Sequence, residues 1–270
     1  MNLARSKDEW LAARKALLAR EKELTRMRDE VSAERRALPW LKVEKPYLFD
    51  TPQGRKTLAD LFEGRSQLAV YHFMFAPEWE AGCKSCSFWA ESFDHIPIHL
   101  AHRDITFLAV SRAPLEKLQA YARRFGWTFP WVSSGPSDFN YDFNVSFRPE
   151  VLKNGTGVYN YQPLVHGESD LPGVSVFARD GSGAVFHTYS AFSRGIDALN
   201  VAYQYIDLAP KGRDEKRGSE TVEWLRRRRL PADAGLPRGQ RSYSSRRRSH
   251  STVSEPRFSS RPLGARSMYW

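Results

Sequence analysis

Residues 67–89 read QLAVYHFMFAPEWEAGCKSCSFW, and this stretch decides the fold. Its first part, residues 67–75, is almost continuously apolar and has the length of a strand, which is typical of a strand buried on both faces of a parallel sheet. Residues 105–110 form a second apolar run of this kind, and residues 115–125 have the spacing of an amphipathic helix. The alternation of strands and helices indicates an α/β protein.

The chain beyond residue 173 completes this layout. Two apolar runs, residues 174–179 and 184–189, flank the turn sequence Asp180-Gly181-Ser182-Gly183 and predict a β-hairpin. Residues 196–205 predict a closing helix. A hairpin added to parallel strands makes the sheet mixed, so we predict a mixed central sheet flanked by helices.

A long charged helix is predicted before this domain, over residues 7–38. Ser6 and Glu9 form a capping box at its start. One stripe of the helix is apolar, with a large residue at every seventh position: Trp10, Leu17, Leu24 and Val31. We expect this stripe to pack on the body of the protein. The alternative is a coiled-coil homodimer through this helix, which Ala13, Arg20 and Glu34 at the alternate seam positions weaken.

The positive charge of the protein is confined to its C-terminal part. Residues 216–270 hold 14 Lys and Arg against 4 Asp and Glu, which accounts for the whole net charge of +10. This part is rich in Arg and Ser and lacks apolar periodicity, so we predict a disordered tail. The predicted organisation is an N-terminal helix over 1–39, an α/β domain over 40–215 and a tail over 216–270. The tail would bind nucleic acid weakly, act as a localisation signal, or have no function of its own.

Composition excludes several classes of protein. Two cysteines cannot staple a secreted scaffold of 270 residues. The first residues lack the apolar core of a signal peptide, and no apolar run is long enough for a membrane span. We therefore expect a cytoplasmic protein with no membrane partner.

The Cys83-Lys84-Ser85-Cys86 motif carries the predicted chemistry. It stands between a buried strand and a helix, where free backbone N–H groups and the helix dipole stabilise a thiolate. Lys84 adds a nearby cation. We predict Cys83 as the attacking thiolate and Cys86, one turn into the helix, as the resolving thiol. A metal site and a non-catalytic pair are the alternatives.

Several blocks resemble one family. They include residues 71–89 around the motif, and the chain is similar to the thioredoxin-like proteins known as domain of unknown function 899 (DUF899) over roughly residues 5–215. The other blocks are residues 9–14, 34–40, 138–143 and 211–215. The resemblance implies a thioredoxin-like fold related to peroxiredoxins and thiol reductases. It also implies a cis-proline facing the dithiol, for which Pro172 is the best placed.

The motif differs from that of the peroxiredoxins, which the chain resembles more distantly. They place a proline, three residues, a threonine and two residues before the cysteine. Here Pro77 stands further from both cysteines, and no threonine lies between. We therefore predict a thiol-disulfide oxidoreductase, with a peroxide reductase as the alternative. Trp79 is predicted either to line a substrate groove or to belong to the core.

A zinc module is the remaining alternative, because His99 and His102 follow the two cysteines. Their spacing is too short for a zinc finger, and Pro97 disturbs the helix that would present them. We therefore predict no metal and no cofactor. The predicted partners are a disulfide-containing protein or a small-molecule thiol or peroxide.

Overall fold

The computed structural model describes residues 3–165, 167–215 and 224–225. The predicted tail over 216–270 thus lies outside the described residues, apart from Trp224 and Leu225. Leu225 is buried and the Trp224 ring contacts Phe88. The packing of the body therefore continues beyond the boundary at residue 215 that we drew from the sequence.

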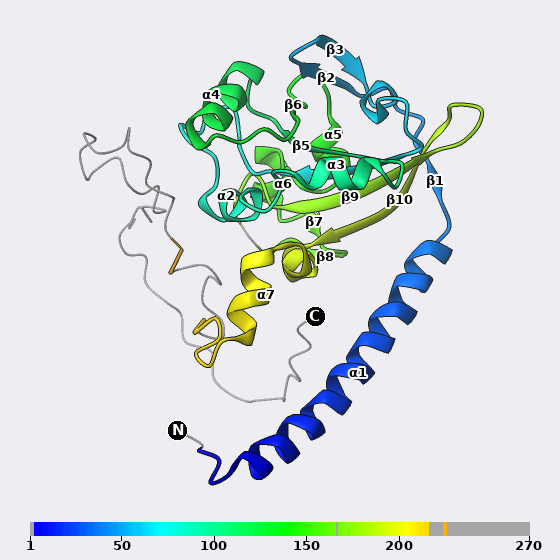
Figure 1. The fold of residues 1–270 in the computed structure, drawn as a ribbon. Helices are drawn as coiled ribbons and strands as arrows, with labels where there is room; N and C mark the ends of the chain where they lie inside the picture. The colour runs from blue at the N-terminus through cyan, green and yellow to red at the C-terminus, as the bar shows by residue number, and fades with distance from the viewer. Residues whose placement is uncertain (1–2, 166, 216–223, 226–270) are drawn as a thin grey trace, which may run out of the picture. The chain divides into compact units, whose positions relative to one another are not determined.

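An eight-stranded mixed sheet organises the body (Figure 1). Its strand order is β1-β10-β9-β4-β5-β6-β2-β3. The strands are β1 (Leu41–Lys42), β2 (Leu48–Thr51), β3 (Gly54–Thr57), β4 (Gln67–His72), β5 (Ile105–Ser111), β6 (Trp131–Ser133), β9 (Gly173–Arg179) and β10 (Val185–Phe192). A separate hairpin pairs β7 (Val158–Tyr159) with β8 (Gln162–Pro163).

The centre of the sheet has the thioredoxin-like arrangement. The strand β4 pairs in parallel with β5 and antiparallel with β9, and β10 continues the sheet antiparallel to β9. The α-helices are α1 (Lys7–Ala37), α2 (Lys84–Ala90), α3 (Ile96–Ala101), α4 (Leu115–Phe125), α5 (Phe139–Asp142), α6 (Pro149–Asn154) and α7 (Val201–Leu208). Short 3₁₀ helices span Asp60–Phe62 and Ser193–Leu199. The predicted fold is therefore confirmed.

Several predicted elements differ from the structure in their extent. The closing helix predicted over residues 196–205 is a 3₁₀ helix over Ser193–Leu199 followed by α7. The strand predicted to reach Phe75 ends at His72, because the chain then leaves the sheet to form the loop before the dithiol. The helical segment that follows the dithiol, which Pro97 was expected to disturb, is two helices, α2 and α3. His95 has a left-handed φ of 71° before α3, and Pro97 lies in the first turn of α3, where proline is tolerated.

The helix α1 forms as predicted, but it does not pack on the body. The Ser6 hydroxyl accepts from Glu9 N at 3.1 Å and caps its first turn. No residue of α1 is buried, and Trp10 and Leu17 are 56% and 55% exposed. The expectation that the stripe packs on the body is therefore wrong for the described residues, because most of the intervening side chains are charged and the stripe is narrow.

Candidate functional site

The dithiol lies where β4 leads into α2. Cys83 is the N-cap residue of α2, and Cys86 is buried in its first turn. Cys83 N donates to Met74 O at 3.0 Å and Met74 N donates to the Cys86 sulfur at 3.4 Å, so the backbone after β4 holds both ends of the motif. Both cysteines are free thiols and they lie 4.1 Å apart. This distance allows a disulfide after a small side-chain rotation.

The two cysteines have opposite electrostatic environments. The pKa of Cys83 is lowered to about 6, mainly by a hydrogen bond from the Cys86 thiol and also by the backbone amides of Cys86 and Ser85, while burial acts in the opposite direction. Burial raises the pKa of Cys86 well above its ordinary value, as do its hydrogen bond to Cys83 and the charge of that thiolate. At neutral pH the pair therefore holds one partly exposed thiolate and one buried thiol.

Aromatic side chains pack against the start of α2. Gly82 precedes the motif where a Cβ atom would lie 2.7 Å from a ring atom of Phe73, so only glycine fits without a shift. The Tyr121 hydroxyl and Ser87 Oγ are 3.1 Å apart, and Ser87 Oγ donates to Cys83 O at 2.8 Å. These contacts fix the first turn of α2, and with it the position of the thiolate.

Tyr71 is a neighbour of the dithiol that the sequence analysis did not single out. Its side chain is 1% exposed, and its hydroxyl lies against Cys86. Burial and the charge of Cys86 raise the pKa of this phenol. Tyr71 therefore stays protonated close to Cys86. No pattern in the sequence separates it from the other aromatic residues of the strand.

The other predicted site residues lie around this helix start. Lys84 is the first residue of α2 and is half-buried, as is Trp79 in the preceding loop. Their predicted roles stay predictions. Trp89, on α2, belongs to the core, because its ring is buried and its Nε1 donates to Ile196 O at 3.1 Å.

Pro172 has the predicted place but not the predicted isomer. It directly precedes β9, whose first residue Gly173 pairs with His72 at the end of β4. No cis peptide bond occurs in the described part of the chain, so the cis-proline prediction is wrong. The trans bond lets the chain run extended into β9, where Tyr159 donates its hydroxyl to Pro172 O at 2.7 Å.

A buried ion pair ties the segment before Pro172 to the end of β5. Arg112 donates to both carboxylate oxygens of Asp170, at 3.0 and 2.5 Å, and to the Tyr141 hydroxyl at 2.8 Å. Ser146 and Ser169 also donate to Asp170. The next residue after Arg112, Ala113, donates its N–H to Phe75 O at 2.9 Å, so this network supports the loop that carries the dithiol.

His99 and His102, the histidines of the zinc alternative, do not form a metal site with the two cysteines in the described part of the chain. The His99 and His102 rings are 6.4 Å apart at the end of α3. Among the described residues, no group of three or more His, Cys, Asp or Glu side chains is placed to hold a metal ion. Within the same residues, the helices lack the combination of length and apolar character that a membrane span needs.

A match to a protein family decides the identity of the chain. Residues 2–229 match the family described as "Bacterial protein of unknown function (DUF899)". The protein is a DUF899 member. This confirms the resemblance that the sequence blocks carried. Comparison of this DUF899 protein with curated proteins finds no match.

Solved structures similar to this DUF899 protein include peroxiredoxins. A PrxQ mutant from Xylella fastidiosa is 14% identical, with 62% of this chain and 95% of that chain covered and a TM-score of 0.38. Peroxidoxin BcpB from Mycobacterium tuberculosis is 14% identical, with 63% and 97% covered and a TM-score of 0.40. A putative thiol-disulfide oxidoreductase from Bacteroides vulgatus is 17% identical, with 58% and 92% covered and a TM-score of 0.34. Likenesses this distant carry no argument about the activity of the DUF899 protein.

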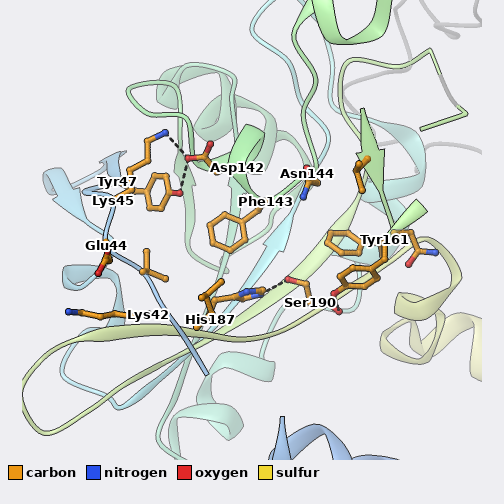
Figure 2. A pocket seen from close by; sticks show the side chains of 15 residues that line it. Lys42, Glu44, Lys45, Tyr47, Asp142, Phe143, Asn144, Tyr161, His187 and Ser190 are labelled. Atoms are coloured by element: carbon orange, nitrogen blue, oxygen red, sulfur yellow. Dashed lines mark hydrogen bonds and ion pairs between the residues drawn. The ribbon is translucent and has the colours of Figure 1, made fainter. Parts of the chain in front are cut away.

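A separate cavity of about 330 Å³ opens between β1, the end of α5, the β7–β8 hairpin and β10. Figure 2 shows Lys45, Tyr47 and Asp142 on one side of it and His187 with Ser190 on the other, with Phe143 between them. Lys45 Nζ and the Tyr47 hydroxyl both donate to Asp142 Oδ2, at 2.7 and 2.8 Å. The polar groups on this side are therefore paired with one another.

A chain of hydrogen bonds runs from this cavity into the core. Its links, each 2.8 Å long, join His187 Nε2 to Ser190 Oγ, Ser190 Oγ to Ser175 Oγ, and Ser175 Oγ to His72 Nε2. The two hydroxyl protons supply two of the three links, so one imidazole must donate through Nε2. His72 Nδ1 has no partner among the described residues, and a buried unpaired N–H costs about 1–3 kcal/mol. His72 is therefore the donor, and its Nδ1 carries the lone pair.

The burial of His72 makes the stability of the protein depend on pH. Burial, and next the charge of His187, lower the pKa of His72 to about 3, whereas a histidine in the unfolded chain titrates near 6.5. Below pH 6.5 the unfolded state binds a proton that the folded state does not, so the free energy of unfolding falls as the pH falls. We expect His72 alone to remove about 2 kcal/mol between pH 7 and pH 5.

Urea unfolding of wild type and His72→Asn at pH 5, 6 and 7 measures this loss. The variant is less stable at every pH but should lose less stability on acidification. The matched control is His99→Asn, because His99 is exposed and should leave the wild-type slope unchanged. Equal slopes in wild type and His72→Asn would contradict the assignment.

Proposed function

We propose that this DUF899 protein is a thiol-disulfide oxidoreductase that works through Cys83 and Cys86. One observation carries the proposal. A partly exposed Cys83, with its pKa lowered to about 6, stands at the N-terminus of α2 and is paired with a buried Cys86 whose pKa is raised. This asymmetry is what a two-step exchange needs, since the attacking group must be a thiolate and the resolving group must stay a thiol until the first step is complete.

The reaction begins with attack of the Cys83 thiolate on a substrate disulfide. The Cys83 sulfur bonds to one substrate sulfur, the substrate S–S bond breaks, and the other substrate sulfur leaves as a thiolate. Cys86 then loses its proton to this thiolate or to water and attacks the Cys83 sulfur. The second substrate thiolate leaves, the substrate has gained two electrons, and the Cys83–Cys86 disulfide has formed. An external dithiol returns the pair to the reduced state.

Alkylation of the reduced protein tests the proposed asymmetry. Iodoacetamide should label Cys83 with a midpoint near pH 6, because the thiolate is the reacting form, and should leave Cys86 unlabelled in the folded protein. Peptide mass spectrometry after labelling from pH 4 to 9 measures both. Labelling of both cysteines with the same midpoint near pH 8.5 would contradict the proposal.

The reduction potential then gives the direction of the reaction. A potential near about −270 mV, as in thioredoxin, makes the protein a reductase, and one near about −120 mV makes it an oxidase. Equilibration with glutathione or dithiothreitol measures it. Consumption of hydrogen peroxide that outpaces disulfide exchange would instead favour the peroxide reductase.

A further inference from the structure

The exposed face of α1 is an apolar feature that the dithiol chemistry leaves unused. Five large residues along it are between 38% and 59% exposed: Trp10, Leu17, Leu24, Met27 and Val31. An amphipathic helix in a protein draws most of its stability from packing of its apolar face. The helix is 31 residues long and buries none of them. Such a face requires a partner.

The spacing of the stripe is that of a coiled coil. With Trp10 as an a position of the heptad, the a positions are all large and apolar: Trp10, Leu17, Leu24 and Val31. The d positions are mixed, with Ala13 and Met27 apolar and Arg20 and Glu34 charged. A seam of this kind is continuous on the a side and interrupted on the d side, which supports a reversible rather than a permanent coiled coil.

The charged residues beside the seam favour a parallel pair of two identical helices. The g positions are Glu9, Ala16, Glu23 and Glu30, and the e positions are Arg14, Glu21, Arg28 and Arg35. In a parallel pair of helices, each g residue faces the e residue five positions further along the other helix. Three of the four contacts then join Glu to Arg: Glu9 to Arg14, Glu23 to Arg28 and Glu30 to Arg35. An antiparallel pair would set g against g and e against e, which opposes Glu to Glu and Arg to Arg.

Contacts within one chain engage the outer groups of this seam more than the middle ones. Within one chain, Arg14 bonds Glu21 through Nη2 at 2.8 Å, and Glu9 Oε2 accepts from Arg5 N at 2.7 Å. Glu23 makes a weak contact with Arg20 at 3.5 Å, and both are largely exposed. Arg35 stacks over the Tyr189 ring at 5.4 Å, so the Glu23–Arg28 contact is the cleanest of the three.

From the exposed stripe and these charges we infer that α1 is the dimerisation element of the protein and pairs in parallel with α1 of a second copy. Arg20 and Glu34 place like charges across the seam, so we expect the dimer to dissociate reversibly on dilution. The inference is independent of the dithiol, because no residue of this seam touches Cys83 or Cys86.

Charge reversal on one face tests the pairing. Glu23→Arg sets Arg against Arg28 across the seam, and Arg28→Glu sets Glu against Glu23. Each variant alone should weaken the dimer about tenfold or more, and an equimolar mixture of the two should restore it as a heterodimer. The control is Lys22→Glu, which reverses a charge at an outward f position and should change nothing. Sedimentation equilibrium from 1 to 200 µM measures the mass, and circular dichroism checks that the helix persists.

A crosslink tests the direction. In a Cys83→Ser/Cys86→Ser background, Val31→Cys places two sulfurs opposite each other in a parallel pair, and oxidation should give a covalent dimer. In an antiparallel pair of fully overlapping helices the same two residues would lie about 27 Å apart along the axis, because Val31 is nine residues from the midpoint of α1. A monomeric mass up to 200 µM would overturn the inference. A dimer that Leu17→Asp/Leu24→Asp leaves intact would also overturn it, because another surface would then hold the two copies.

Discussion

Replacing Cys83 with serine should abolish disulfide exchange by this protein, with a loss of about a thousandfold or more. A serine hydroxyl is almost fully protonated at neutral pH, whereas Cys83, with its pKa lowered to about 6, is mostly a thiolate. The loss should appear in the reduction of a model disulfide such as oxidised glutathione or insulin, with dithiothreitol as the electron source. Circular dichroism should show that the fold is unchanged.

Substitutions of Cys86 separate the two steps. Cys86→Ser leaves the attacking thiolate in place but removes the resolving thiol, so the protein should stop at a mixed disulfide on Cys83 that mass spectrometry detects. Cys86→Ala should also stop at the mixed disulfide. In addition, it should raise the pKa of Cys83, because it removes the hydrogen bond that contributes most to lowering that pKa. If Cys83→Ser kept turnover while Cys86→Ser lost it, the assigned roles would be reversed.

Local signals predicted much of the fold and of the dithiol. The helix α4 was predicted to the residue, because an apolar stripe, Pro114 before it and Gly126 after it all act within the segment, and Gly126 has the left-handed φ of 72° that a helix end favours. The motif is equally local. The motif lies between a strand and a helix in the sequence, so Cys83 stands at the start of the helix whatever the rest of the fold is.

The supporting network could not be predicted, because its partners are distant in sequence. Arg112 and Asp170 are 58 positions apart, and His72 and Ser175 are 103 apart. Each is an ordinary polar residue in its own segment. Their pairing depends on the sheet order, which brings β9 beside β4, and that order depends on the whole chain.

Removing the carboxylate of Asp170 should destabilise the protein by about 3–5 kcal/mol. The side chains of Asp170 and Arg112 are 3% and 13% exposed, so Asp170→Ala leaves a guanidinium mostly out of water without its counter-charge. Ser146 and Ser169 lose their acceptor at the same time. Urea unfolding at pH 7 measures the loss as a change in midpoint.

An exposed ion pair provides the matched control. Arg55 and Asp50 are joined at 3.0 Å, but their side chains are 58% and 38% exposed, so Asp50→Ala should cost no more than about 1 kcal/mol. The difference between the two aspartates therefore measures the effect of burial on the same chemistry.

A double substitution separates the loss of the pair from the burial of an unpaired charge. Arg112→Met/Asp170→Leu removes both charges and fills the space with apolar groups, so it should be more stable than Asp170→Ala. Because the network supports the loop that carries the dithiol, Asp170→Ala should also raise the midpoint pH of Cys83 alkylation, whereas Asp50→Ala should not. If Asp170→Ala cost no more than Asp50→Ala, the ion pair would not be what holds the segment before Pro172 against β5.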